Sequence, residues 1–172
     1  MKPPLLPSEA LKRVVRLARF DGMSLLVVSG AFALISAASR DVGGALIGLL
    51  IAGAGAIELH GVALLRAGYN GMRWLISSQL CLMAMILIYA GIRIARPDVS
   101  WIMPYVKGEA AEPIIQAAQQ SGMTVEQLLI EGMSTLYVMV AAITVIYQGG
   151  MAVYYVRRRV AVEIALQEFV SE

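Results

Sequence analysis

Segment 53–66, GAGAIELHGVALLR, places Glu58 and His60 inside an apolar, glycine-rich stretch. Residues two apart on a helix point about 200° away from each other, so these two side chains need separate explanations. In transmembrane helices, a stripe of small residues is typical of close packing between helices. Helical spacing places Glu58 on such a stripe with Gly44, Gly48, Gly55 and Gly61. We therefore expect its carboxyl group to lie inside the protein, away from lipid.

Polar side chains occur in all four apolar stretches of the sequence. In each stretch, one of them lies about seven or eight residues from the end expected at the cytoplasmic side. An ionised carboxylate at that depth costs about 2.5 to 3.5 kcal/mol on insertion scales, and more in other estimates. Glu58 is therefore expected to be protonated, to accept hydrogen bonds from Gln79 and Gln148, or to face water. The pattern predicts an ion- or solute-binding site made by Ser29, Glu58, Ser78, Gln79, Thr144 and Gln148. The alternative is that one or two hydrogen bonds between helices merely set their register.

Other chemistry has weaker support in the sequence. His60 is the only histidine, which favours an interfacial or subunit-contact role over haem ligation by two copies of the chain. The methionines could bind Cu(I), but Met also commonly fills membrane cores, and Cys81 is the only cysteine. The sequence has no phosphate loop, dinucleotide fingerprint, HExxH or GxSxG motif. We expect no enzyme activity, no metal and no cofactor.

The elements that position these side chains follow from composition. Hydrophobic residues make up 59% of the 172, and the mean hydropathy is +0.72, as in integral membrane proteins. About 20 apolar residues in a helix cross the hydrocarbon layer. The sequence therefore predicts an all-α, integral membrane four-helix bundle within a single membrane domain. Its expected transmembrane helices are 22–38, 42–65, 72–95 and 134–156.

Three further segments flank these spans. Residues 1–21 contain a basic amphipathic pattern, which predicts a cytoplasmic helix lying along anionic headgroups. The alternative is that residues 1–38 form a cleaved signal peptide. Residues 97–133 are too polar to span, and they predict a small extracytoplasmic cap with one helix from Glu112 to Gly122 and another from Thr124. Residues 157–172 predict an amphipathic cytoplasmic helix.

Orientation follows from the lysines and arginines, which favour cytoplasmic loops. Four basic and six acidic residues fall on the opposite side, in 39–41 and 93–133. This asymmetry predicts a multi-pass protein of a bacterial-type inner membrane with both termini cytoplasmic. The basic residues expected on the cytoplasmic side are Lys2, Lys12, Arg13, Arg16, Arg19, Arg66, Arg73, Arg157, Arg158 and Arg159.

Two function classes fit these features. The first is a homo-oligomeric channel or transporter with a protonatable intramembrane site for a cation or small polar solute. More than one copy is expected because a single four-helix chain has little room for a pathway. The second is a non-catalytic scaffold or accessory subunit that binds a membrane partner protein. A net charge of +2, with basic residues that follow topology, makes nucleic acid an unsuitable partner.

Overall fold

The computed structural model describes residues 6–100, 102–103, 106 and 111–171, with side chains described to residue 168. Five helices and no strands occur in these residues, so the all-α prediction is confirmed for them. The helices are α1 (Pro7–Ala38), α2 (Val42–Arg66), α3 (Met72–Ala95), α4 (Glu112–Ser121) and α5 (Val125–Ser171). Four of them, α1, α2, α3 and α5, are long and apolar enough to cross a membrane.

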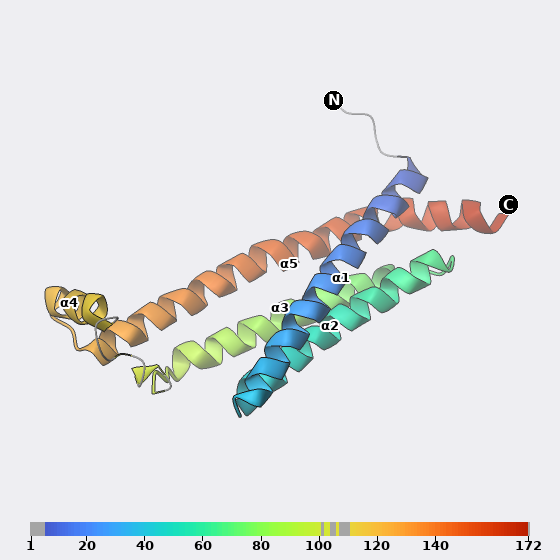
Figure 1. Ribbon diagram of the computed structural model, residues 1–172. Coiled ribbons are helices and arrows are strands. Elements are labelled where there is room, and N and C mark those ends of the chain that lie inside the picture. The colour runs from blue at the N-terminus through green and yellow to red at the C-terminus, as the bar shows by residue number, and fades with distance from the viewer. Residues whose placement is uncertain (1–5, 101, 104–105, 107–110, 172) are drawn as a thin grey trace. The chain divides into compact units, whose positions relative to one another are not determined.

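The chain divides into two compact units, and α3 and α5 each contribute to both. The first unit contains residues 1–85 and 145–172, and the second contains residues 86–144. Figure 1 labels the helices of both units. The first unit holds most of the side chains considered as a site.

Two helices are longer than the sequence analysis expected. α1 runs without a break from Pro7 to Ala38, so the basic segment 8–20 is the first part of the same helix as the first apolar span. Its apolar residues Val14 and Ala18 were expected on lipid headgroups, but they are fully buried in the protein core. α5 likewise joins the second cap helix, the fourth span and the C-terminal segment. Adjacent helical segments merge because none of the three junctions contains a proline, and the glycines near them, Gly22 and Gly132, do not have the positive φ of a helix cap.

The first two helices form a hairpin through the turn at Ser39–Asp41. The carboxylate of Asp41 accepts a hydrogen bond from Gly44 N at 3.0 Å, which caps the start of α2. Along the hairpin, α1 and α2 approach closely at two glycines of α2. A Cβ atom on Gly48 would lie 2.9 Å from Cβ of Ala33, and one on Gly55 would lie 2.8 Å from the carbonyl oxygen of Gly22.

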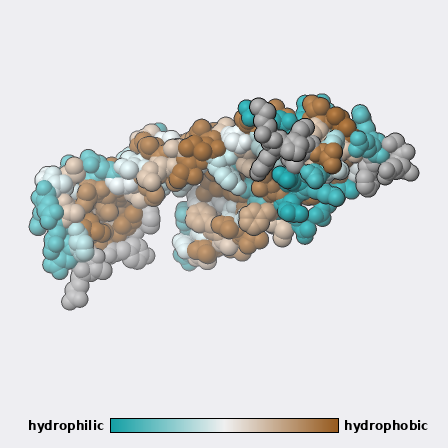
Figure 2. Space-filling model, turned by 90° about the horizontal axis from the view of Figure 1, so that it is seen from above, coloured by the Kyte–Doolittle hydropathy of each residue, from teal (hydrophilic) through white to brown (hydrophobic). Residues whose placement is uncertain are grey.

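The core of the first unit lies where α1, α2, α3 and α5 meet. It contains Val14 and Ala18 of α1, Val62 and Leu65 of α2, Met72 and Leu75 of α3, and Met151, Tyr155, Val162 and Leu166 of α5. Burial of side chains from four separate helices holds the unit together, because each buried aliphatic side chain contributes about 1.5 to 3 kcal/mol relative to exposure. Figure 2 shows hydrophilic residues gathered around the end of this unit where α1 begins and α5 finishes.

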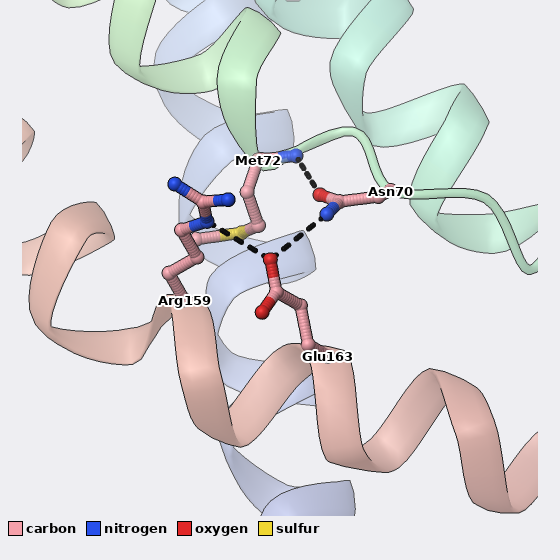
Figure 3. Close-up of polar contacts among 4 residues, drawn as sticks. All are labelled: Asn70, Met72, Arg159 and Glu163. Atoms are coloured by element: carbon pink, nitrogen blue, oxygen red, sulfur yellow. Dashed lines mark hydrogen bonds and ion pairs between the residues drawn. The ribbon is translucent and has the colours of Figure 1, made fainter.

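The turn between α2 and α3 is tied to α5 by a small polar network (Figure 3). Asn70 accepts a hydrogen bond from Met72 N at 3.2 Å, and its amide donates to Glu163 Oε1 at 3.0 Å. Arg159 Nε donates to the same carboxylate oxygen at 2.9 Å. The network connects the last part of α5 to the turn that begins α3, so both lie at the same end of the first unit.

The second unit contains α4, the last part of α3 and the first part of α5. The short helix begins at Glu112 and ends at Gly122, whose φ of 69° is the left-handed geometry of a glycine C-cap. Thr124 and Gln127 form the expected capping box, with bonds of 2.9 and 3.2 Å. Arg93 Nε donates to the hydroxyl of Tyr137 at 3.1 Å. At the end of α3, hydrogen bonds from Ser100 lower the pKa of the exposed Asp98.

Substitution of Gly55 by Ala should destabilise the protein by about 1 to 3 kcal/mol, since the added methyl group would overlap the backbone of α1. Gly53→Ala is the matched control, because no atom lies within 4 Å of a Cβ built there. Thermal unfolding in detergent measures both. Equal stability of the two variants would show that the hairpin does not pack this closely.

Replacement of Asn70 by Ala should cost about 1 to 2 kcal/mol, because Met72 N and Glu163 each lose a hydrogen-bond partner. Asn70→Asp keeps an acceptor for Met72 N but places a second carboxylate against Glu163. We therefore expect Asn70→Asp to be less stable than the wild type in the same unfolding assay. Wild-type stability in both variants would contradict the proposed tie between α5 and the turn.

Candidate functional site

Two carboxyl groups are buried together in the first unit. Glu58 of α2 is fully buried, and Asp21 of α1 is 5% exposed. The two groups lie close enough to repel each other when both are ionised. Two like charges that are buried together are costly, so a proton on one of the two groups would relieve the repulsion.

Helix packing explains why Glu58 is inside. The small residues Gly55 and Gly61, one turn to either side of it, are in close contact with α1 and α3 respectively. Gly44 and Gly48 are also buried. The glycine stripe thus lies against other helices of the same chain, and Glu58, which shares its face, is carried into the interior.

Two tyrosines of α5 donate hydrogen bonds to the carboxyl groups. The hydroxyl of Tyr155 donates to Glu58 Oε1 at 2.8 Å, and the hydroxyl of Tyr147 donates to Asp21 Oδ1 at 3.0 Å. Tyr155 is fully buried. The two tyrosines are eight residues apart, which places them on one face of the helix about two turns from each other. One face of α5 therefore supplies a donor to each acid.

α3 supplies the third donor. The amide nitrogen of Gln79 donates to Asp21 Oδ2 at 2.8 Å, so both oxygens of Asp21 have a partner. Next to Gln79, the hydroxyl of Ser78 donates to the carbonyl oxygen of Ala54 at 2.7 Å and joins α3 to α2. Both side chains of α3 are fully buried. The pair of acids is therefore surrounded by α1, α2, α3 and α5.

Among the described residues, three buried side-chain oxygen atoms have no hydrogen-bond donor within the protein. They are Glu58 Oε2, Gln79 Oε1 and Gln148 Oε1. Gln148 lies seven residues before Tyr155, on the same face of α5. A buried acceptor without a donor costs about 1 to 3 kcal/mol. All three atoms are acceptors, so each can accept a hydrogen bond from water or from a protonated group, or coordinate a cation.

The structure brings together only part of the predicted residue set. Glu58, Ser78 and Gln79 lie in the arrangement described above. Gln148 is also buried, and it follows Tyr147 directly in the sequence. Ser29 is buried, but its hydroxyl donates to the carbonyl oxygen of Leu25 in its own helix. Thr144 is buried and belongs to the second unit. The expected donors to Glu58 were Gln79 and Gln148, whereas Tyr155 donates to Glu58 and Gln79 donates to Asp21.

Asp21, Tyr147 and Tyr155 were not among the predicted site residues. Asp21 was placed outside the first span, although it lies eight residues before Ser29 and hence on the same helix face. Tyr155 lies seven residues after Gln148, so helical spacing places it on the face of a predicted site residue, and this spacing was the available signal. His60 is exposed and packs edge-on against Trp74, with ring centroids 5.3 Å apart.

Comparisons with protein-family models, with curated proteins and with solved structures find no match to this chain. Function is therefore inferred from the site itself.

Removal of the hydroxyl in Tyr155→Phe should destabilise the protein by about 1 to 3 kcal/mol, because Glu58 Oε1 becomes a second buried oxygen of Glu58 without a donor. Tyr154→Phe is the matched control, since its ring packs against Tyr155 and Arg158 on the neighbouring face. Unfolding in detergent compares the two. A smaller loss of stability in Tyr155→Phe than in Tyr154→Phe would contradict the stabilising role of this hydrogen bond.

Proposed function

We propose that this chain is a multi-pass membrane transport protein in which the Asp21–Glu58 pair binds and releases a proton as ions or small polar solutes cross the membrane. The observation that carries the proposal is the burial of two carboxyl groups that interact by charge, with no donor to Glu58 Oε2 among the described residues. Buried acceptors in a purely structural hydrogen-bond network are usually matched by donors.

A proton suits this arrangement better than a fixed countercharge would. Protonation of Glu58 at Oε2 turns an unpaired acceptor into a donor, which can then serve one of the glutamine oxygens. It also removes one of two negative charges that would otherwise be buried together. Loss of the proton reverses both effects, so the two protonation states favour different local arrangements of α2, α3 and α5. Such a difference is what couples proton binding to movement of helices.

The direction of the protein in the membrane follows from its basic residues. The turn between α2 and α3 and the last part of α5 lie at one end of the first unit, as the hydrogen bond between Asn70 and Glu163 shows. The start of α1 lies at the same end (Figure 1). Of the ten basic residues expected on the cytoplasmic side, Lys2 lies outside the described residues and the other nine belong to this unit. We place this end in the cytoplasm of a bacterial-type cell, with residues 97–133 outside.

The site then lies close to the cytoplasmic surface. Glu58 is eight residues before Arg66, or about 12 Å along the helix axis. Asp21 is only two residues from Arg19 in α1. We propose that more than one copy of the chain assembles around the pathway. Because the glycine stripe of α2 is already in contact with α1 and α3, contacts between copies would use other surfaces.

The test is proton flux into liposomes that contain the purified protein and a pH-sensitive dye, driven by a potassium gradient with valinomycin. We expect Glu58→Gln and Asp21→Asn each to reduce the flux at least tenfold. Glu9→Gln, an exposed residue of α1, makes the same change in charge and should leave the flux unchanged. Thermal unfolding establishes that the variants are folded, since glutamine at position 58 retains an acceptor for Tyr155.

Wild-type flux in both Glu58→Gln and Asp21→Asn would refute the role of the pair. No flux in the wild-type protein, in assays of proton and of radioactive sodium, would refute transport. That result would favour the scaffold or accessory subunit, for which a stoichiometric membrane partner should be recovered on purification.

A further inference from the structure

A cavity of about 540 Å³ lies on the surface of the first unit, where α1 faces the end of α2. Its lining combines four cations with apolar side chains. The cations are Lys12, Arg16 and Arg19 of α1 and Arg66 of α2, and the apolar residues are Val15, Phe20 and Met23. None of these residues takes part in the carboxyl pair. The proposed transport function therefore gives this cavity no role.

We propose that this cavity binds the phosphate headgroup of an anionic phospholipid. Guanidinium groups bind phosphate oxygens through paired, charge-assisted hydrogen bonds, and three of the four cations are arginines. The volume falls within the range of about 300 to 1,000 Å³ that is usual for small-molecule sites, so a headgroup fits. Basic pockets between helices at the cytoplasmic surface suit the headgroups of anionic lipids.

The surface that continues from the cavity distinguishes a lipid from a free phosphate. Helical spacing carries the face of Arg16 and Phe20 along α1 through Met23, Val27 and Leu34. Phe20 is 72% exposed, Val27 is 62% exposed and Leu34 is 75% exposed. A Cβ built on Gly30, between them, has no atom within 4 Å. The face thus changes from cationic to apolar and open, which matches a headgroup followed by acyl chains and offers nothing to a soluble phosphate.

Continuity of α1 gives this surface its geometry. Because Pro7–Ala38 is one helix, the cations at its start and the apolar residues farther along are held in a single line. Val14 and Ala18, on another face, are buried against the core and hold the helix in place. The cations are therefore presented at the level where the apolar surface of α1 begins, and this is the level of phosphates in a bilayer.

The test measures lipid binding to the full-length protein in detergent by native mass spectrometry. The probes are dioleoyl phosphatidylglycerol and dioleoyl phosphatidylcholine. We expect the wild-type protein to retain phosphatidylglycerol at least tenfold more strongly, and the double variant Arg16→Gln/Arg19→Gln to lose that preference. Arg66→Gln, on the other helix of the cavity, should weaken it independently. Circular dichroism and gel filtration verify that each variant is folded.

The matched control is Arg13→Gln/Arg157→Gln, which removes the same charge from two exposed positions outside the cavity. It should bind phosphatidylglycerol within twofold of the wild type. An equal loss in the control and cavity variants would overturn the proposal, because the attraction would then be general. Complete competition by inorganic phosphate would also overturn it, in favour of a soluble phosphate.

The result of the lipid-binding test can be distinguished from the result of the proton-flux test. Lipid retention is measured without flux, and the cavity variants leave Asp21 and Glu58 unchanged. Loss of the lipid preference in Glu58→Gln would indicate a global change in the helices, whereas an unchanged preference keeps the two tests independent.

Discussion

Burial of Asp21 and Glu58 in one place is the constraint on which the rest of this structure depends. Two carboxyl groups that leave water need donors or protons, because neither an apolar side chain nor lipid can replace hydration. α5 supplies hydrogen-bond donors from Tyr147 and Tyr155, and α3 supplies a donor from Gln79. The helices that form the core of the first unit are therefore also the helices that supply the acids and their partners.

Close packing makes this burial achievable. The glycines of α2 bring its backbone against α1 and α3, so that Glu58 reaches a space that lipid does not enter. The same packing leaves Glu58 Oε2, Gln79 Oε1 and Gln148 Oε1 without donors from the part of the chain that the structure describes. A protein that gains stability from apolar packing can retain a few such atoms, and they tend to occur where a ligand or a proton exchanges.

The first unit has acidic groups in its interior and basic groups at a nearby surface. The buried acids are Asp21 and Glu58. At the surface of α1, the cavity is lined by Lys12, Arg16, Arg19 and Arg66. Arg19 and Asp21 are only two residues apart, and helical geometry sends one outward and the other inward. A single helix therefore presents cations at the surface on one face and a buried carboxyl group on another.

The amino-acid sequence by itself determined the helical spans, the glycine stripe and the inward position of Glu58, because apolar length and helical periodicity are local properties of the chain. The bounds of α3 and the caps at Gly122 and Thr124 were predictable for the same reason. Only the tertiary structure decided that Asp21 joins Glu58 and that Tyr147 and Tyr155 donate to them. Those contacts join residues 37 to more than 120 positions apart. The rotation and depth at which separate helices meet depend on packing between them, which no single stretch of sequence encodes.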